Sequence, residues 1–259
     1  MTTPAERLTE LLSAGEPVLD RVMAVIASIA PDAPTEDDVV GELDQLAEGL
    51  EHDAPAGKVM RYAYGQLGFV GNVANYYNPA NSLIHRVLRD RRGIPLTLAA
   101  VGVELARRSG TELSIVGLPG HVVVGEGGNP TRWFDPFAGG AELDLDDCRR
   151  LFARFSPIEQ FSPDMLSPID QRTTTVRMLN NLKVSYRSLG DLSQIAKVLE
   201  LAVSVPGSPV SERHELASVL AALGRDERAI EQRELLADLD PGRAANHRLA
   251  ARHHRARRN

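Results

Sequence analysis

One segment of the chain reads Pro95-Leu-Thr-Leu-Ala-Ala-Val-Gly-Val-Glu-Leu-Ala-Arg-Arg108. Proline is favoured at the first position of a helix and glycine just past the last, where Gly110 stands, so the segment predicts a helix over 95–108. Its apolar residues form two stripes, Leu96, Ala99, Ala100 and Val103 on one and Leu98, Val101 and Leu105 on the other. A helix that is apolar nearly all round is buried on every side. We therefore expect it at the centre of a domain.

Short runs of β-forming residues follow this helix. We expect strands over 113–118, 121–125 and 131–135, with a turn at Gly127-Gly-Asn-Pro130 before the last one. A helix followed by an antiparallel meander predicts an α+β domain rather than a doubly wound parallel sheet. We place this domain at residues 56–165, after packing helices in residues 1–55.

Helix signals also precede the central helix. The apolar spacing over 5–29 and the acids that follow Thr35 predict two packing helices. Asn78 before Pro79 predicts the start of another helix, with Asn78 as its N-cap. Gly93 is expected just past the end of that helix, because glycine tolerates the left-handed conformation found there.

The C-terminal part of the chain contains an internal repeat. Leu182-x-x-x-Tyr186-x-x-Leu189-Gly190 recurs as Leu216-x-x-x-Leu220-x-x-Leu223-Gly224. Each position recurs after 34 residues, which is the period of tetratricopeptide helix pairs. Two copies are too few for a free-standing solenoid, because each repeat buries its face against its neighbours. We expect tetratricopeptide-like helices over 166–242, packed on a further element, and a basic tail over 243–259.

Charge is unevenly distributed along the 259 residues. There are 29 basic and 35 acidic residues, a net charge of −6, but residues 243–259 hold six Arg and no acid, which leaves −12 on residues 1–242. An acidic body argues against a nucleic-acid-binding domain, which carries a basic face on the fold itself. No apolar run approaches the roughly 18 residues of a membrane span, and the N-terminus lacks an export signal. We expect a cytoplasmic protein that binds neither nucleic acid nor membrane.

His121 and Asp135 form the most site-like pair in the sequence. They fall on the two strands joined by the 127–130 turn. A connecting loop with an odd number of residues places them on the same face of the sheet, and a four-residue loop places them on opposite faces. A carboxylate beside an imidazole fixes its tautomer and stabilises the protonated form, as in catalytic triads. Trp133 is expected beside the pair, where it would exclude water.

Four motifs resemble those of the bacterial SirB-type proteins, the regulators of sirC expression, in which a transglutaminase-like domain precedes tetratricopeptide repeats. They are Asn78-Pro-Ala-Asn-Ser-Leu83, Arg92-Gly-Ile-Pro-Leu-Thr-Leu98, Leu118-Pro-Gly-His-Val122 and Phe134-Asp-Pro-Phe-Ala-Gly-Gly140. The resemblance covers roughly residues 35–240. It implies a papain-like fold, in which the start of a central helix presents a nucleophile to a His and an Asp on the sheet.

The resemblance assigns His121 and Asp135 to the His and Asp of transglutaminase-like enzymes. The Gly-x-Cys motif of their nucleophile then falls on Gly93-Ile-Pro95, so that Pro95 occupies the cysteine position. Acyl transfer of this type requires a thiolate activated by the imidazole, and proline has no nucleophilic atom.

No other side chain replaces that nucleophile. Thr97 lies about 200° further round the helix and would face away from His121. Ser82 is expected to cap a helix. Cys148, the single cysteine, follows two acids that disfavour its thiolate. His52, His85 and His214 are scattered at no ligand spacing, and His253-His254 lies in the tail, so neither a metal nor a cofactor is expected.

We therefore favour a catalytically inactive transglutaminase- or protease-like protein that acts by binding or regulation. A peptide or small carboxamide would contact Asn78, Asn81 and Trp133 near the His121–Asp135 pair, and the helical repeats would bind a protein or peptide partner. One alternative is a hydrolase or acyl transferase in which His121 is a general base oriented by Asp135. Another is a structural scaffold that acts through the helical repeats alone. The sequence does not indicate an oligomeric state.

Overall fold

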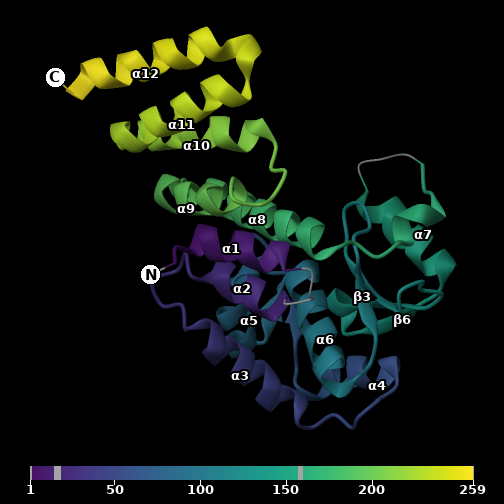
Figure 1. Cartoon of the computed structure of the whole chain (residues 1–259). Helices are drawn as coiled ribbons and strands as arrows, with labels where there is room; N and C mark the ends of the chain where they lie inside the picture. The colour runs from purple at the N-terminus through teal and green to yellow at the C-terminus, as the bar shows by residue number, and fades with distance from the viewer. Residues whose placement is uncertain (1, 15–18, 157–159, 259) are drawn as a thin grey trace. The chain divides into compact units, whose positions relative to one another are not determined.

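The computed structural model describes residues 2–14, 19–156 and 160–258, and it contains two compact units (Figure 1). One unit comprises Glu16–Met178, and the other comprises Met1–Gly15 together with Leu179–Asn259. The division falls within a single helix, α8 (Gln171–Ser188). It differs from the four segments expected from the sequence, because the first helix groups with the C-terminal helices.

The unit Glu16–Met178 is the α+β domain. Its helices are α2 (Leu19–Ala27), α3 (Glu36–Ala47), α4 (Ala56–Met60), α5 (Ile84–Asp90), α6 (Pro95–Ser109), α7 (Leu145–Phe155) and the beginning of α8, with short turns η1 (Arg61–Gln66), η2 (Pro79–Ser82), η3 (Pro136–Ala138) and η4 (Pro163–Leu166). Its strands are β1 (Val70–Gly71), β2 (Arg92–Gly93), β3 (Leu113–Val116), β4 (Val123–Glu126), β5 (Trp133–Asp135) and β6 (Ala141–Leu143).

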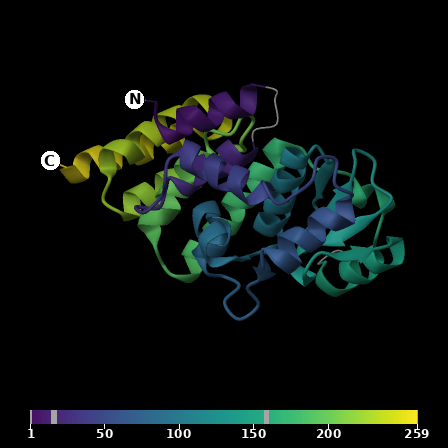
Figure 2. The same cartoon turned by 90° about the horizontal axis from the view of Figure 1, so that it is seen from below.

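Helix α6 is the centre of this unit, as the sequence predicts. It begins at Pro95 and ends before Gly110, which has a φ of 82°, a value that a residue with a side chain rarely adopts. Helices α2, α3, α4 and α5 pack against it, and so do strands β3 and β4 (Figures 1 and 2). These helices and the strands bury both apolar stripes of α6, as a helix that is apolar nearly all round requires.

The main sheet is antiparallel and has the order β3-β4-β5-β6. Its first three strands are the predicted meander, although each is shorter than expected. His121 lies just before β4 rather than inside it. In the register of β4 with β5, Val124 pairs with Phe134 and Gly125 with Trp133.

The predicted end of the helix after Pro79 is wrong. Asn78 does act as an N-cap, but of the 3₁₀ turn η2, and the chain is extended at Leu83 before α5 begins. Helix α5 ends at Arg91, which itself adopts the left-handed conformation with a φ of 54°. Gly93 instead belongs to β2, where it pairs with Gly71.

The second unit is helical. It contains α1 (Pro4–Ser13), the end of α8, α9 (Leu192–Ala202), α10 (Val210–Ala222), α11 (Asp226–Leu239), the turn η5 (Pro241–Arg243) and α12 (Ala244–Arg258). Gly190 and Gly224 are 34 residues apart. Each comes just after a helix, and each has a φ of 68°. The repeat therefore corresponds to equivalent turns between helices, while the tetratricopeptide assignment stays a prediction.

The segment expected to be a basic tail is largely a helix packed against α11. His247 and Ala251 of α12 are buried, with exposed fractions of 3% and 1%. Among the described residues, no helix is both long and apolar enough to cross a membrane.

Candidate functional site

The structure brings His121 and Asp135 together. The Nε2 atom of His121 lies 3.1 Å from Oδ1 of Asp135, and the side chains are 5% and 6% exposed. When the register of β4 with β5 is continued by one residue, Asp135 falls opposite Val123. His121 is two residues before Val123, so the side chains of His121 and Asp135 are diagonal neighbours on one face of the sheet. Seven residues connect the paired residues Gly125 and Trp133. Because this number is odd, His121 and Asp135 lie on the same face, which is one of the two arrangements that the sequence left open.

Asp135 is held in place mainly by backbone groups. Its Oδ1 accepts hydrogen bonds from the amides of Phe137 at 2.8 Å and Ala138 at 3.2 Å, so that it caps η3. The ring nitrogen Nε2 of His121 lies near that oxygen but makes no hydrogen bond to it or to any other described residue. Two backbone donors thus stabilise the carboxylate whether or not the imidazole is protonated.

Two phenylalanines cover the imidazole of His121. The ring of Phe155 stacks on it with centroids 5.2 Å apart and planes 14° from parallel. Phe137 contacts it edge-on, with centroids 6.4 Å apart. These contacts explain the low exposure of a polar ring, and they leave little of it accessible to water.

Arg177 of α8 positions the backbone that carries His121. Its guanidinium donates to the carbonyl oxygens of Gly117 at 2.8 Å, His121 at 3.2 Å and Leu118 at 3.4 Å. Burial lowers the pKa of this guanidinium. Gly120, with a φ of 77°, is also required here, because a Cβ atom would collide with the backbone of Phe155.

The residue at the predicted nucleophile position, Pro95, is buried at the start of α6. Thr97 serves the local structure, since its Oγ1 donates to Asn81 O at 2.6 Å and accepts from Ile94 N at 3.2 Å. Cys148 is fully buried, and burial together with the nearby Asp147 carboxylate raises the pKa of its thiol to about 12. Neither Thr97 nor Cys148 is therefore available as an activated nucleophile.

The predicted ligand contacts have structural partners. Asn78 accepts from Ala80 N as a cap. The amide nitrogen of Asn81 donates to two backbone oxygens at 2.7 and 3.0 Å, and its oxygen accepts from Asn72. Trp133 belongs to an apolar cluster that also contains Val123 and Cys148. A ligand role for these residues stays a prediction.

Sequence reasoning missed an exposed aromatic surface beside the pair. Tyr76 stacks edge-on against Tyr77 at 5.4 Å and against Phe137 at 6.0 Å, and Phe137 in turn touches His121. Tyr77 is 59% exposed, Tyr76 is 41% exposed, and Phe155, on the other side of His121 in this chain of ring contacts, is 43% exposed. The adjacent tyrosines at 76–77 are the sequence signal for this surface, while the asparagines around them indicate only a helix start.

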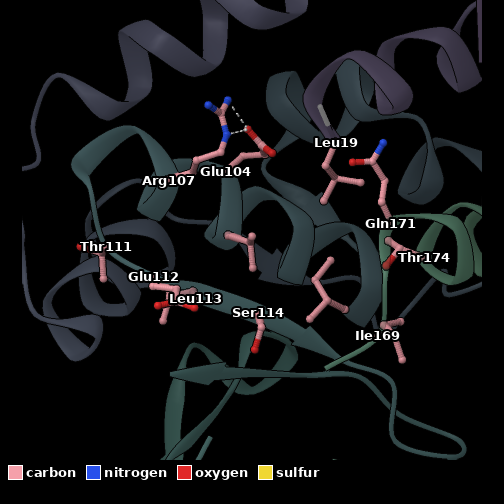
Figure 3. A pocket seen from close by; sticks show the side chains of 12 residues that line it. Leu19, Glu104, Arg107, Thr111, Glu112, Leu113, Ser114, Ile169, Gln171 and Thr174 are labelled. Atoms are coloured by element: carbon pink, nitrogen blue, oxygen red, sulfur yellow. Dashed lines mark hydrogen bonds and ion pairs between the residues drawn. The ribbon is translucent and has the colours of Figure 1, made fainter. Parts of the chain in front are cut away.

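A cavity of about 320 Å³ lies elsewhere in this unit, between α6, β3 and the beginning of α8 (Figure 3). Glu104 and Arg107 form an ion pair at one edge, and apolar side chains such as Leu19 and Ile169 line much of it. Neither His121 nor Asp135 lines this cavity.

A family model described as the transglutaminase-like superfamily matches residues 37–180. The chain belongs to this superfamily. Its match covers the central helix, the sheet and both members of the His121–Asp135 pair. A protein named UPF0162 protein from Xylella fastidiosa is 33% identical over 161 residues, which are 60% of this chain and 57% of that protein.

Human F-box only protein 21 is 31% identical over 160 residues, 61% of this chain but 24% of its own length. The chain thus aligns with little more than half of the first relative and a quarter of the second. A solved structure of menin aligns with 96% of this chain and 68% of its own, with a TM-score of 0.43 and 13% identity, a likeness too distant to establish a shared fold. The SirB-type assignment stays a prediction.

Proposed function

We propose that the transglutaminase-like domain of this protein binds a peptide segment of a partner protein and does not catalyse acyl transfer. The observation that carries this proposal is the absence of an activated nucleophile among the described residues. Pro95 begins the central helix, and the only thiol, that of Cys148, is buried with a pKa raised to about 12. Transglutaminase-type chemistry needs a thiolate next to the imidazole.

The surroundings of His121 favour a structural role for the pair. A general base must reach the proton that it removes, directly or through one water. The His121 ring is instead stacked under Phe155, and its side chain is 5% exposed. This cover counts against the alternative of a hydrolase with His121 as general base.

The aromatic surface next to the pair supports peptide binding. We define it as Tyr76, Tyr77, Phe137 and Phe155, which ring contacts connect directly or through His121. Tyrosine and phenylalanine are enriched at protein interfaces, because they bury a large area at a small cost in side-chain entropy. Exposed apolar groups that lie next to one another mark interaction sites more often than scattered ones do. Arg154, stacked on Phe155 at 4.9 Å, adds a cation at its edge.

Turnover assays test the catalytic half of the proposal. Purified full-length protein would be incubated with a glutamine-containing peptide and a primary amine, and both ammonia and the cross-linked product would be measured. We expect no turnover above that of a His121→Ala variant. Turnover that disappears in His121→Ala would contradict the proposal.

A displayed library of random peptides tests the binding half. We expect the full-length protein to enrich peptides with apolar side chains, and the double variant Tyr76→Ala/Tyr77→Ala to lose that enrichment. Leu249→Ala is the matched control, because Leu249 is an exposed apolar side chain (53%) on α12, in the other, helical unit. Equal enrichment by the tyrosine variant would place binding elsewhere, and the scaffold alternative would then be preferred.

A further inference from the structure

Three potential metal ligands meet in the helical unit although they are far apart in sequence. His214 lies on α10, Asp240 directly follows α11, and His247 lies on α12, the three helices labelled at the C-terminal end in Figure 1. The Oδ2 atom of Asp240 is 3.7 Å from Nε2 of His214 and 3.6 Å from Nε2 of His247. One ligand atom from each residue lies within 4.8 Å of the other two.

These separations fit a shared ion better than direct hydrogen bonds. A hydrogen bond would bring nitrogen and oxygen to about 2.7–3.2 Å. Around a tetrahedral Zn²⁺ with bonds of about 2.0–2.1 Å, neighbouring ligand atoms stand roughly 3.3 Å apart. The spacing of 3.6 and 3.7 Å about Asp240 reaches that arrangement with side-chain shifts of less than about 1 Å.

A second observation points to a ligand at the same place. His247 is 3% exposed, and its Nε2 has no hydrogen-bond partner among the described residues. A buried polar atom without a partner costs about 1–3 kcal/mol, which a bound ion would offset.

We propose that His214, Asp240 and His247 bind a divalent transition-metal ion, of which Zn²⁺ fits the two-imidazole, one-carboxylate set best. Water would complete the coordination. The ion would join α10, the end of α11 and α12, so that it fixes the C-terminal helix within its own unit. Arg243 approaches the same Asp240 oxygen at 4.0 Å, but its side chain is 70% exposed and is free to turn outward.

The spacing of these residues, 26 and then 7 positions, follows no local ligand motif. Sequence spacing therefore predicts no metal site here, and His214 alone does not indicate Asp240 and His247 as its partners. Packing of three helices creates the cluster, and sequence proximity does not.

Metal titration of the full-length, tag-free protein tests the proposal. After chelator treatment, Zn²⁺ binding would be followed by calorimetry and elemental analysis, and Co²⁺ would be added as a spectroscopic probe of tetrahedral nitrogen and oxygen ligation. We expect one ion per chain, a Zn²⁺-dependent rise in melting temperature, and Co²⁺ absorption bands of tetrahedral intensity. Stabilisation by a ligand grows as RT ln(1 + [L]/Kd), so the rise should increase with Zn²⁺ concentration.

Variants locate the binding. Asp240→Asn and His214→Gln keep the size of the side chain and should weaken Zn²⁺ binding by more than about tenfold, as should His247→Ala. The double variant His253→Ala/His254→Ala serves as the control. It removes two consecutive histidines that are not among the proposed ligands, and it should bind Zn²⁺ like the unmodified protein. Loss of binding in that variant, retention in Asp240→Asn, or no stoichiometric binding in the unmodified protein would each overturn the proposal.

Discussion

The burial of the single cysteine, Cys148, determines how readily its thiol ionises. Cys148 lies in the apolar cluster with Trp133 and Phe152, and its pKa is raised to about 12 mainly by burial. The acids that precede Cys148 in the sequence predict a raised pKa, and Asp147 contributes in that direction, but burial is the larger effect. An acid of this kind makes folding less favourable as the pH rises above its unfolded pKa of about 8.5.

We therefore expect native Cys148 to resist alkylation. At pH 8 the folded thiol should react with iodoacetamide at least ~1000-fold more slowly than a free cysteine, because the thiolate fraction is that much smaller. Mass spectrometry of intact protein with and without urea provides the measurement. Rapid labelling without urea would show that the thiol is accessible and ionised, and it would remove the main support for an inactive domain.

The His121–Asp135 pair can be tested by asking what each residue stabilises. Asp135 caps η3, and Asp135→Ala should cost about 1–2 kcal/mol in the free energy of unfolding. His121→Phe should cost less than about 1 kcal/mol, because a phenyl ring keeps the contacts with Phe155 and Phe137 and removes an unpaired buried nitrogen. Urea unfolding of both variants gives the comparison. A large loss of stability in His121→Phe would show that the imidazole nitrogen itself is needed.

At the scale of elements, a buried ion network joins α6 to α2 and α3. Arg108 contacts Asp20 of α2 at 2.8 Å, Asp44 of α3 at 2.7 Å and Glu104 at 2.5 Å, and its side chain is 8% exposed. Arg107 contacts two of the same acids but is 43% exposed. The two arginines thus form a matched pair in different surroundings.

We expect Arg108→Leu to cost about 3 kcal/mol and Arg107→Leu about 1 kcal/mol in urea unfolding, because only the first leaves buried carboxylates without their closest cation. Burial raises the pKa of Glu104. An acid with a raised pKa binds its proton more readily in the folded state, so the deficit of Arg108→Leu should shrink as the pH is lowered from neutrality and Glu104 takes up its proton. Equal losses in the two variants would show that burial of the network has no energetic consequence.

The elements that the sequence predicts well are those with local signals. The bounds of α6 follow from Pro95 and Gly110, and the meander follows from its alternating runs. The end of α5 could not be predicted, because Arg91 adopts a conformation that glycine normally takes, and the nearby Gly93 lies in β2 instead, paired with Gly71. The aromatic cover of His121 depends on Phe155, which lies 34 residues away in sequence, and only the packing of α7 brings it there.

At the scale of the whole molecule, the uneven charge does not create a separate basic tail. Six arginines follow residue 242, while the preceding residues carry a net charge of −12. Yet α12 packs against α11, and Ala251 and His247 are buried there. Arg255 pairs with Glu234, but these side chains are 54% and 52% exposed. Apolar packing therefore holds this helix more than charge does.

This balance predicts a weak dependence of α12 on salt. An exposed ion pair contributes about 0–1 kcal/mol and is screened as ionic strength rises, whereas the burial of Ala251 is insensitive to screening. Hydrogen exchange of residues 244–258 should thus accelerate by less than about fivefold between roughly 0.05 and 0.5 M NaCl. Glu234→Gln is the matched control and should show the same modest acceleration already at low salt. An acceleration of more than about a hundredfold would mean that α12 is bound by electrostatic attraction to the acidic body, as the charge distribution alone would indicate.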